Sequence, residues 1–124
     1  MGSLSISARE RWIAPVLETW VTTELSKWIA VQEDAYRLYF WHTHTGQEVD
    51  FLLARGEEII AIEVTASTRV ESRDLAGIEL CEEKLGKRIR FSVVLYRGDQ
   101  VIGLGRRRVA VPFDVAFLGP KRKA

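Results

Sequence analysis

Hydrophobic side chains recur along this chain with two spacings, one typical of helices and the other typical of strands. Between residues 12 and 32 they return every three or four positions, as at Ile13, Leu17 and Val21, which predicts an amphipathic helix. The apolar pattern at residues 69–86 predicts a second helix. Runs rich in β-branched and aromatic residues predict strands at 36–43, 48–54, 58–66 and 90–96, and shorter strand-like, edge-like segments at 101–104 and 109–118.

The order of these elements predicts the fold class. Three consecutive strands with short connections favour antiparallel pairing, whereas a strand that arrives through a helix favours parallel pairing. The chain is therefore expected to be an α/β protein whose mixed β-sheet is flanked by helices on both faces. We expect one domain at residues 11–118, a flexible N-terminal segment at 1–10 and a basic tail at 119–124.

Composition adds limits but no partner. The 124 residues are 47% hydrophobic and 28% charged, which is typical of one globular domain, and the net charge of +1 favours no class of ligand. Cys81 is the single cysteine, so an intrachain disulfide is excluded and a reducing compartment is expected. There is no apolar run of about 18 residues and no phosphate-binding G-x-x-x-x-G-K-[ST] motif. We therefore expect a cytoplasmic protein without a membrane segment or an ATP site.

Asp50 and Glu63 are acidic residues inside the two β-like stretches of the predicted hairpin at residues 48–66. Gly56 and Glu57 suit a two-residue loop, because glycine is preferred at the first position of a type II′ turn. The register set by that loop places Asp50 directly opposite Glu63. A loop of odd length would instead send the two carboxylates to opposite faces of the sheet.

Facing carboxylates destabilise a hairpin unless their charge is compensated. A shared proton, a nearby arginine or lysine, or a divalent cation could compensate it, and Mg²⁺ suits one or two carboxylates with bound water. Alternatively, Asp50 and Glu63 lie on a solvated face and pair with surface cations. On the first helix, Glu24 is centred on the apolar stripe and Glu18 lies at its margin. Glu24 either bonds to backbone amides or points into the pocket of the hairpin acids.

Several stretches of the chain resemble a known family over residues 12 to about 112. They are "VLETWVTTELSKW", "LYFWHTHTGQEVDFLLA", "IIAIEVTAS", "VVLYRGD" and "VAVP". These stretches resemble the C-terminal domain of unknown function in a large prokaryotic family of AAA+ ATPases. That domain is similar in motif order to the PD-(D/E)XK superfamily of nucleases. The resemblance implies a restriction-endonuclease-like fold and association with an ATPase module.

The resemblance also implies a site. In PD-(D/E)XK nucleases an acid from the first helix, an aspartate on one strand and a glutamate on the next bind Mg²⁺, and a lysine two residues further on helps to activate water. By this resemblance, the candidate Mg²⁺ ligands are Asp50 and Glu63 with Glu18, or its rival Glu24, as the helix acid.

Thr65 stands at the lysine position of this motif. A hydroxyl group neither polarises an attacking water nor stabilises phosphate charge as an ammonium group does. Lys27 is the nearest other lysine on the first helix, and we expect its helical phase, roughly 300° from Glu24, to keep it away from that acid. The site is therefore expected to be degenerate.

Basic residues near the C-terminus suggest a nucleic-acid contact. Arg106, Arg107 and Arg108 form a run that could neutralise phosphates, or could simply keep the surface soluble. His42 stands where the resembling family often has an arginine, and near neutral pH it could contact a phosphate only in part. His42 and His44 lack the further nearby ligands that a zinc site needs.

The sequence thus suggests a nuclease-like domain of an ATPase-associated protein, degenerate at Thr65, that binds nucleic acid or a partner protein. One alternative is an active Mg²⁺-dependent DNA endonuclease, and another is a purely structural protein-interaction domain. The candidate partners are DNA and an ATPase module or other protein, while the oligomeric state is not predicted.

Overall fold

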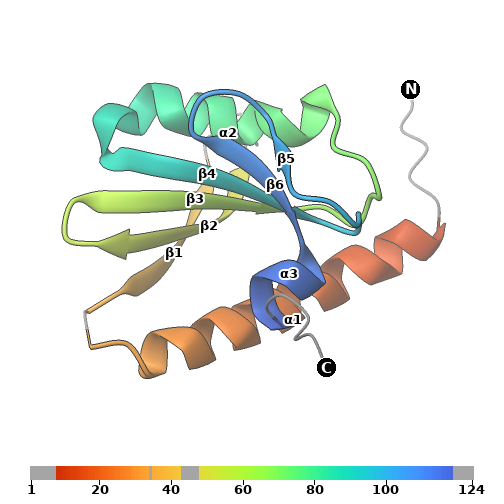
Figure 1. Cartoon of the computed structure of the whole chain (residues 1–124), viewed down its shortest axis with the longest axis horizontal. Coiled ribbons are helices and arrows are strands. Elements are labelled where there is room, and N and C mark those ends of the chain that lie inside the picture. Colours follow the sequence, from red (N-terminus) through yellow and green to blue (C-terminus); the bar gives the residue numbers. More distant parts are fainter. Residues whose placement is uncertain (1–7, 34, 43–47, 119–124) are drawn as a thin grey trace.

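A computed structural model describes the backbone of residues 8–33, 35–42 and 48–118, and the side chains of 16–33, 35–41 and 51–117. Within these residues the chain forms a sheet between helices (Figure 1). The helices are α1 (Ala8–Ala30), α2 (Ser72–Leu85) and α3 (Phe113–Leu118), with a short 3-10 helix, η1 (Gly86–Arg88). The strands are β1 (Arg37–His42), β2 (Glu48–Arg55), β3 (Glu58–Val64), β4 (Ile89–Tyr96), β5 (Ile102–Gly103) and β6 (Arg108–Pro112).

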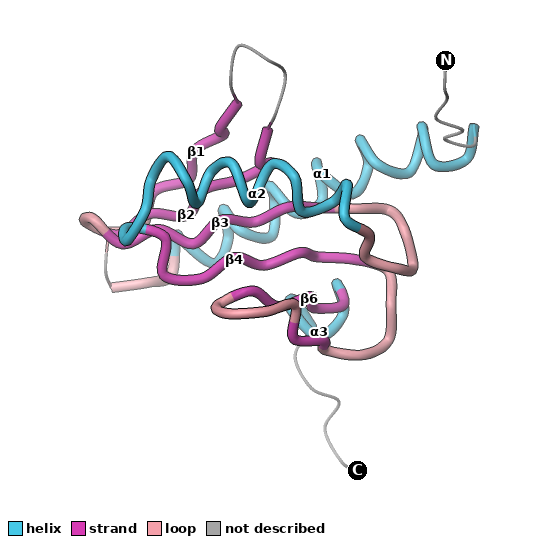
Figure 2. Tube along the Cα trace, turned by 90° about the horizontal axis from the view of Figure 1, so that it is seen from above, coloured by secondary structure: helices cyan, strands magenta, loops and turns pink. Residues whose placement is uncertain are grey.

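The sheet is mixed, as predicted. Its strands lie in the order β1-β2-β3-β4-β6-β5. The meander β1-β2-β3 is antiparallel, whereas β3 pairs with β4, and β4 with β6, in parallel. The parallel β3–β4 pair requires a crossover, which α2 provides. Figure 2 shows α2 lying across one face of the sheet, while α1 lies on the other face.

Side chains alternate along the strands and give each face its own core. On the α2 face, Leu52 and Ala61 pack against Ile78 and Cys81 of α2. On the α1 face, the fully buried Phe51 belongs to the cluster that includes Val21 and Leu25 of α1. The α/β class and the helices on both faces are therefore confirmed.

The C-terminal part of the chain differs from the prediction of a strand-like edge segment at 109–118. Strand β6 ends at Pro112, and the next six residues form α3. Phe113 and Phe117, one helical turn apart, both pack edge-to-face on the Trp20 ring of α1, with centroid distances of 6.2 and 5.0 Å. This tertiary contact explains the helix. Strand β6 is not the edge either, because β5 pairs with its outer side.

The predicted hairpin turn is confirmed. Gly56 and Glu57 form the loop, and Arg55 pairs with Glu58. Gly56 has φ +60°, and Glu57 is not among the residues with positive φ, as expected for a type II′ turn. Pairing is described as far as Phe51 and Ile62.

Candidate functional site

Four polar side chains join α2 to the parallel strands β4 and β6. Register places Ser92 of β4 beside Arg108 of β6, and both reach Glu82 of α2. Ser92 Oγ donates to Glu82 Oε2 at 2.8 Å, and Arg108 Nε lies 3.1 and 3.2 Å from the two carboxylate oxygens. Arg108 Nη2 also donates to Glu82 Oε1, and Nη1 lies 3.5 Å from Glu79. We call Glu82, Ser92 and Arg108 the clamp.

The clamp keeps its charges in a partly buried position. Burial disfavours the charged carboxylate of Glu82 and by itself would raise its pKa. Hydrogen bonds from Arg108 and Ser92, together with the positive charge of Arg108, outweigh this effect and hold the pKa of Glu82 below its ordinary value. The hydrogen bond to Glu82 in turn raises the pKa of Arg108. Burial and the Glu82 charge raise the pKa of the neighbouring Cys81 thiol to about 11, so this cysteine is not a reactive nucleophile at neutral pH.

Backbone hydrogen bonds of the strands that carry the clamp hold the turn between β5 and β6. The carbonyl of Arg107 accepts a hydrogen bond of 2.9 Å from the Ser92 amide, and the Arg108 carbonyl accepts one of 3.0 Å from Leu104. Gly105 and Arg107 both have positive φ, at +123° and +60°. Arg107 is the one non-glycine residue with positive φ in the described chain, and this conformation costs roughly 1–2 kcal/mol for a side chain.

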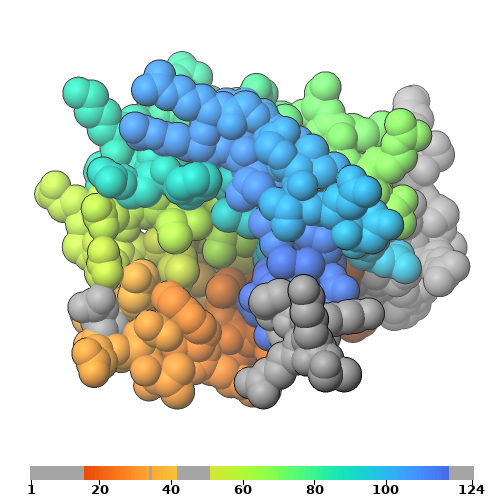
Figure 3. Space-filling view, in the orientation of Figure 1, coloured from red at the N-terminus to blue at the C-terminus, as the bar shows by residue number. Residues whose placement is uncertain are grey.

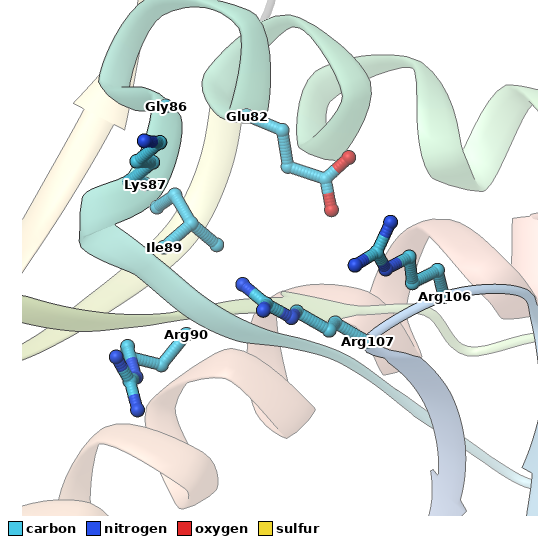
Figure 4. A pocket seen from close by; sticks show the side chains of 7 residues that line it. All are labelled: Glu82, Gly86, Lys87, Ile89, Arg90, Arg106 and Arg107. Carbon is cyan, nitrogen blue, oxygen red and sulfur yellow. The ribbon is translucent and has the colours of Figure 1, made fainter.

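A cavity of about 490 Å³ lies between this turn and the end of α2. Figure 4 shows Arg106 and Arg107 extending across the cavity towards Glu82 and Ile89. In Figure 3, the blue surface of the β5–β6 segment adjoins the teal surface of the α2–β4 connection. The residues that line the cavity are Glu82, Gly86, Lys87, Ile89, Arg90, Arg106 and Arg107. The cavity is therefore rich in cationic side chains.

Most of these cationic side chains form no ion pair within the described part of the protein. Lys87, Arg106 and Arg107 form no ion pair with any described residue, and Arg90 has one long contact of 3.8 Å with Glu58. The acidic lining residue, Glu82, is already held by Arg108 and Ser92. The arrangement is chemically suited to an anion.

The sequence predicted part of this cavity and missed the rest. Arg106 and Arg107, which were candidates for a phosphate contact, both line it. Arg108 was grouped with them, but its guanidinium lies against α2. The missed residues are Lys87 and Arg90, whose signal was the basic string "GKRIR" directly after the second helix.

The predicted acidic site is only partly described. Glu63 is half-buried at the end of β3, and alternation with Ala61 places it on the α2 face. Asp50 directly precedes Phe51 in β2, but its side chain lies outside the described residues. The side chain of His42 also lies outside them. Among the described residues, no group of three or more potential metal ligands is found. The pairing of Asp50 with Glu63, and Mg²⁺ binding there, stay predictions.

The helix acids do not share the position of Glu63. Glu24 lines an apolar cavity on the α1 face and pairs with Lys27, with Nζ and Oε2 3.2 Å apart. The expected separation of Lys27 from Glu24 was therefore wrong, since a step of 300° forward is 60° back, and residues three apart are neighbours on a helix. Glu18 is exposed on α1.

Thr65 is held by local contacts. Its amide donates to the Leu95 carbonyl at 2.9 Å, which extends the β3–β4 pairing, and its hydroxyl accepts a hydrogen bond of 3.2 Å from the Ser67 amide. Position 65 therefore carries a short, locally bonded hydroxyl.

Comparison with known proteins gives a family but no activity. Residues 15–115 match a family described as a domain of unknown function, DUF4143. No curated protein and no solved structure matches the chain. In the described part of the chain, none of the helices has the length and apolar character needed to cross a membrane.

The clamp generates a prediction about acid stability. A carboxylate whose pKa is lowered by folding contributes its full stabilisation above its unfolded pKa of about 4.3, and loses it as the pH falls through the lower folded value. We expect Glu82→Gln to reduce the free energy of unfolding at pH 7 by about 1.5–3 kcal/mol, with a smaller reduction at pH 3. Urea unfolding at both pH values measures the difference.

The control for this experiment is Glu83→Gln, which changes an exposed acid on the same helix. It should leave the free energy of unfolding within about 0.5 kcal/mol of the original at pH 7. Equal effects of the two substitutions would contradict the stabilising role of the clamp.

Proposed function

We propose that this chain, which belongs to the DUF4143 family of domains of unknown function, binds nucleic acid through its basic cavity. The observation that carries this proposal is the convergence of Lys87, Arg106 and Arg107 on one cavity without ion pairs among the described residues. Clustered cations bind phosphates and release their counterions, which supplies much of the affinity for nucleic acids. The near-neutral total charge does not oppose this, because the local cluster sets the field at the cavity.

We further propose that the domain is nuclease-like and does not cleave. The observed succession of a helix, three strands, a second helix and a parallel strand agrees with the elements expected from the sequence, and Thr65 offers no ammonium group. The association with an AAA+ ATPase module is supported by the sequence resemblance alone, and it makes that module the proposed protein partner.

Binding can be measured by fluorescence anisotropy with a labelled DNA oligonucleotide at about 50 and 200 mM salt. Affinity should fall with salt, and changing both Arg106 and Arg107 to Ala should weaken binding and reduce the slope of log affinity against log salt by about 2. The matched control changes Arg69 and Arg73, two exposed arginines beside the start of α2, to Ala.

The control removes the same net charge from another place. If both double variants lose affinity equally, the cavity has no special part in binding. If the unmodified protein does not bind DNA at any salt concentration, the nucleic-acid proposal is wrong and a role in partner-protein binding gains support.

One observation favours a second candidate, a Mg²⁺-dependent DNA endonuclease. The confirmed hairpin register reaches Phe51 and Ile62, and one further step along both strands would pair Asp50 with Glu63. This is the pairing that two carboxylates need in order to share a metal ion.

A plasmid-nicking assay with Mg²⁺ or Mn²⁺ separates the two candidates. We expect the original protein to nick no faster than Asp50→Asn, because Thr65 cannot replace the motif lysine. Thr65→Lys should then raise nicking by roughly a hundredfold if only the ammonium group is missing. Nicking by the original protein that Asp50→Asn abolishes would instead establish the endonuclease.

A further inference from the structure

We infer that the basic cavity receives a phosphate monoester, namely the phosphorylated end of a nucleic-acid strand. This inference rests on the proposed function and names the part of the nucleic acid that the same site would take. It follows from the charge, the shape and the backbone of the cavity.

The cations that line the cavity come from separate parts of the chain. Lys87 lies in η1 and Arg90 is the second residue of β4, whereas Arg106 and Arg107 come from the β5–β6 turn and extend towards Glu82 and Ile89 (Figure 4). A phosphate monoester carries a charge of about −1.5 to −2 near neutral pH and presents three acceptor oxygens. An internal phosphodiester carries a single charge and has fewer free oxygens. A cluster of four cations, three of them arginines able to donate in pairs, is better matched by the monoester.

Glu82, the acidic lining residue, does not cancel the positive charge of the cations around the cavity. The Glu82 carboxylate accepts hydrogen bonds from Ser92 and from Arg108, and Arg108 is not a lining residue. An entering anion therefore meets a carboxylate whose charge is already balanced. The clamp in this way lets an acidic residue form a wall of an anion site.

The shape also favours a strand end. The volume of about 490 Å³ is within the range of roughly 300–1,000 Å³ typical of small-molecule sites. An internal phosphate can enter such a hollow only if the strand is accommodated on both sides of it. A terminal phosphate needs room for the strand on one side only.

The conformation of the β5–β6 turn is fixed by contacts within the protein itself. Arg107 keeps a left-handed φ of +60°, which glycine would adopt without strain, and its carbonyl is fixed by the Ser92 amide at 2.9 Å. An arginine at this costly position places a cation at the cavity on a rigid backbone. Preorganised donors of this kind bind more tightly because less freedom is lost on binding.

The test compares two oligonucleotides of identical sequence, one with a 5′-phosphate and one with a 5′-hydroxyl, in the anisotropy assay. We expect the phosphorylated strand to bind about tenfold more tightly, and Arg107→Gly to remove that preference. Because glycine relieves the positive φ, the unfolding midpoint of Arg107→Gly should not fall, so a lost preference would not reflect misfolding. The control Arg73→Ala should keep the preference.

The outcomes separate this inference from the proposed function. Equal binding of the two strands, with the salt dependence intact, would overturn the strand-end inference and leave nucleic-acid binding standing. Absence of binding by both strands would overturn both. Competition by inorganic phosphate or adenosine 5′-monophosphate identifies other sources of the same chemistry. If either competitor bound as tightly as the phosphorylated strand, the ligand would be a small phosphate compound and the inference would be wrong.

Discussion

The ion pair between Glu82 and Arg108 joins two elements that are distant in the sequence. It ties helix α2 to strand β6, and the Ser92 hydroxyl adds strand β4 to the same carboxylate. Removing one partner from such a contact is costly, because the remaining charge stays partly buried without its bonds. The Glu82 carboxylate therefore helps to hold strands β4 and β6 against α2, in addition to apolar packing. The basic cavity lies directly beside this contact, so its geometry depends on the same interaction.

The basic cavity and the hairpin acids lie at different positions along strand β4. The cationic side chains gather where β4 begins, whereas Glu63 pairs across from Val94 further along that strand. The four steps from Arg90 to Val94 span about 13 Å at roughly 3.3 Å per residue. An anion held in the cavity would therefore not sit at the hairpin acids. A strand anchored in the cavity could still extend towards them, and the proposed phosphate binding would then need no catalysis at the hairpin acids.

Local patterns in the sequence predicted the elements whose structure depends on neighbouring residues. Gly56 determines the hairpin register because a two-residue loop permits one pairing, and the apolar spacing of Leu17 and Val21 identifies α1. Helix α3 was missed because it forms against Trp20, about ninety residues earlier in the chain. The cavity was only partly predicted, since its two walls meet through the β4–β6 pairing, which no local pattern reveals. The contact between Arg108 and Glu82 was missed for the same reason, because the two residues lie on different elements.

The central claim is that the clamp positions the cations of the cavity. It is tested most directly by titrating the phosphorylated oligonucleotide into Glu82→Gln, which keeps Lys87, Arg106 and Arg107 and makes the cavity more positive by one charge. If position governs binding, affinity falls in this variant even though its net charge favours the anion. If charge alone governs binding, a folded Glu82→Gln protein binds as tightly as the original or more tightly, and that result would contradict the account.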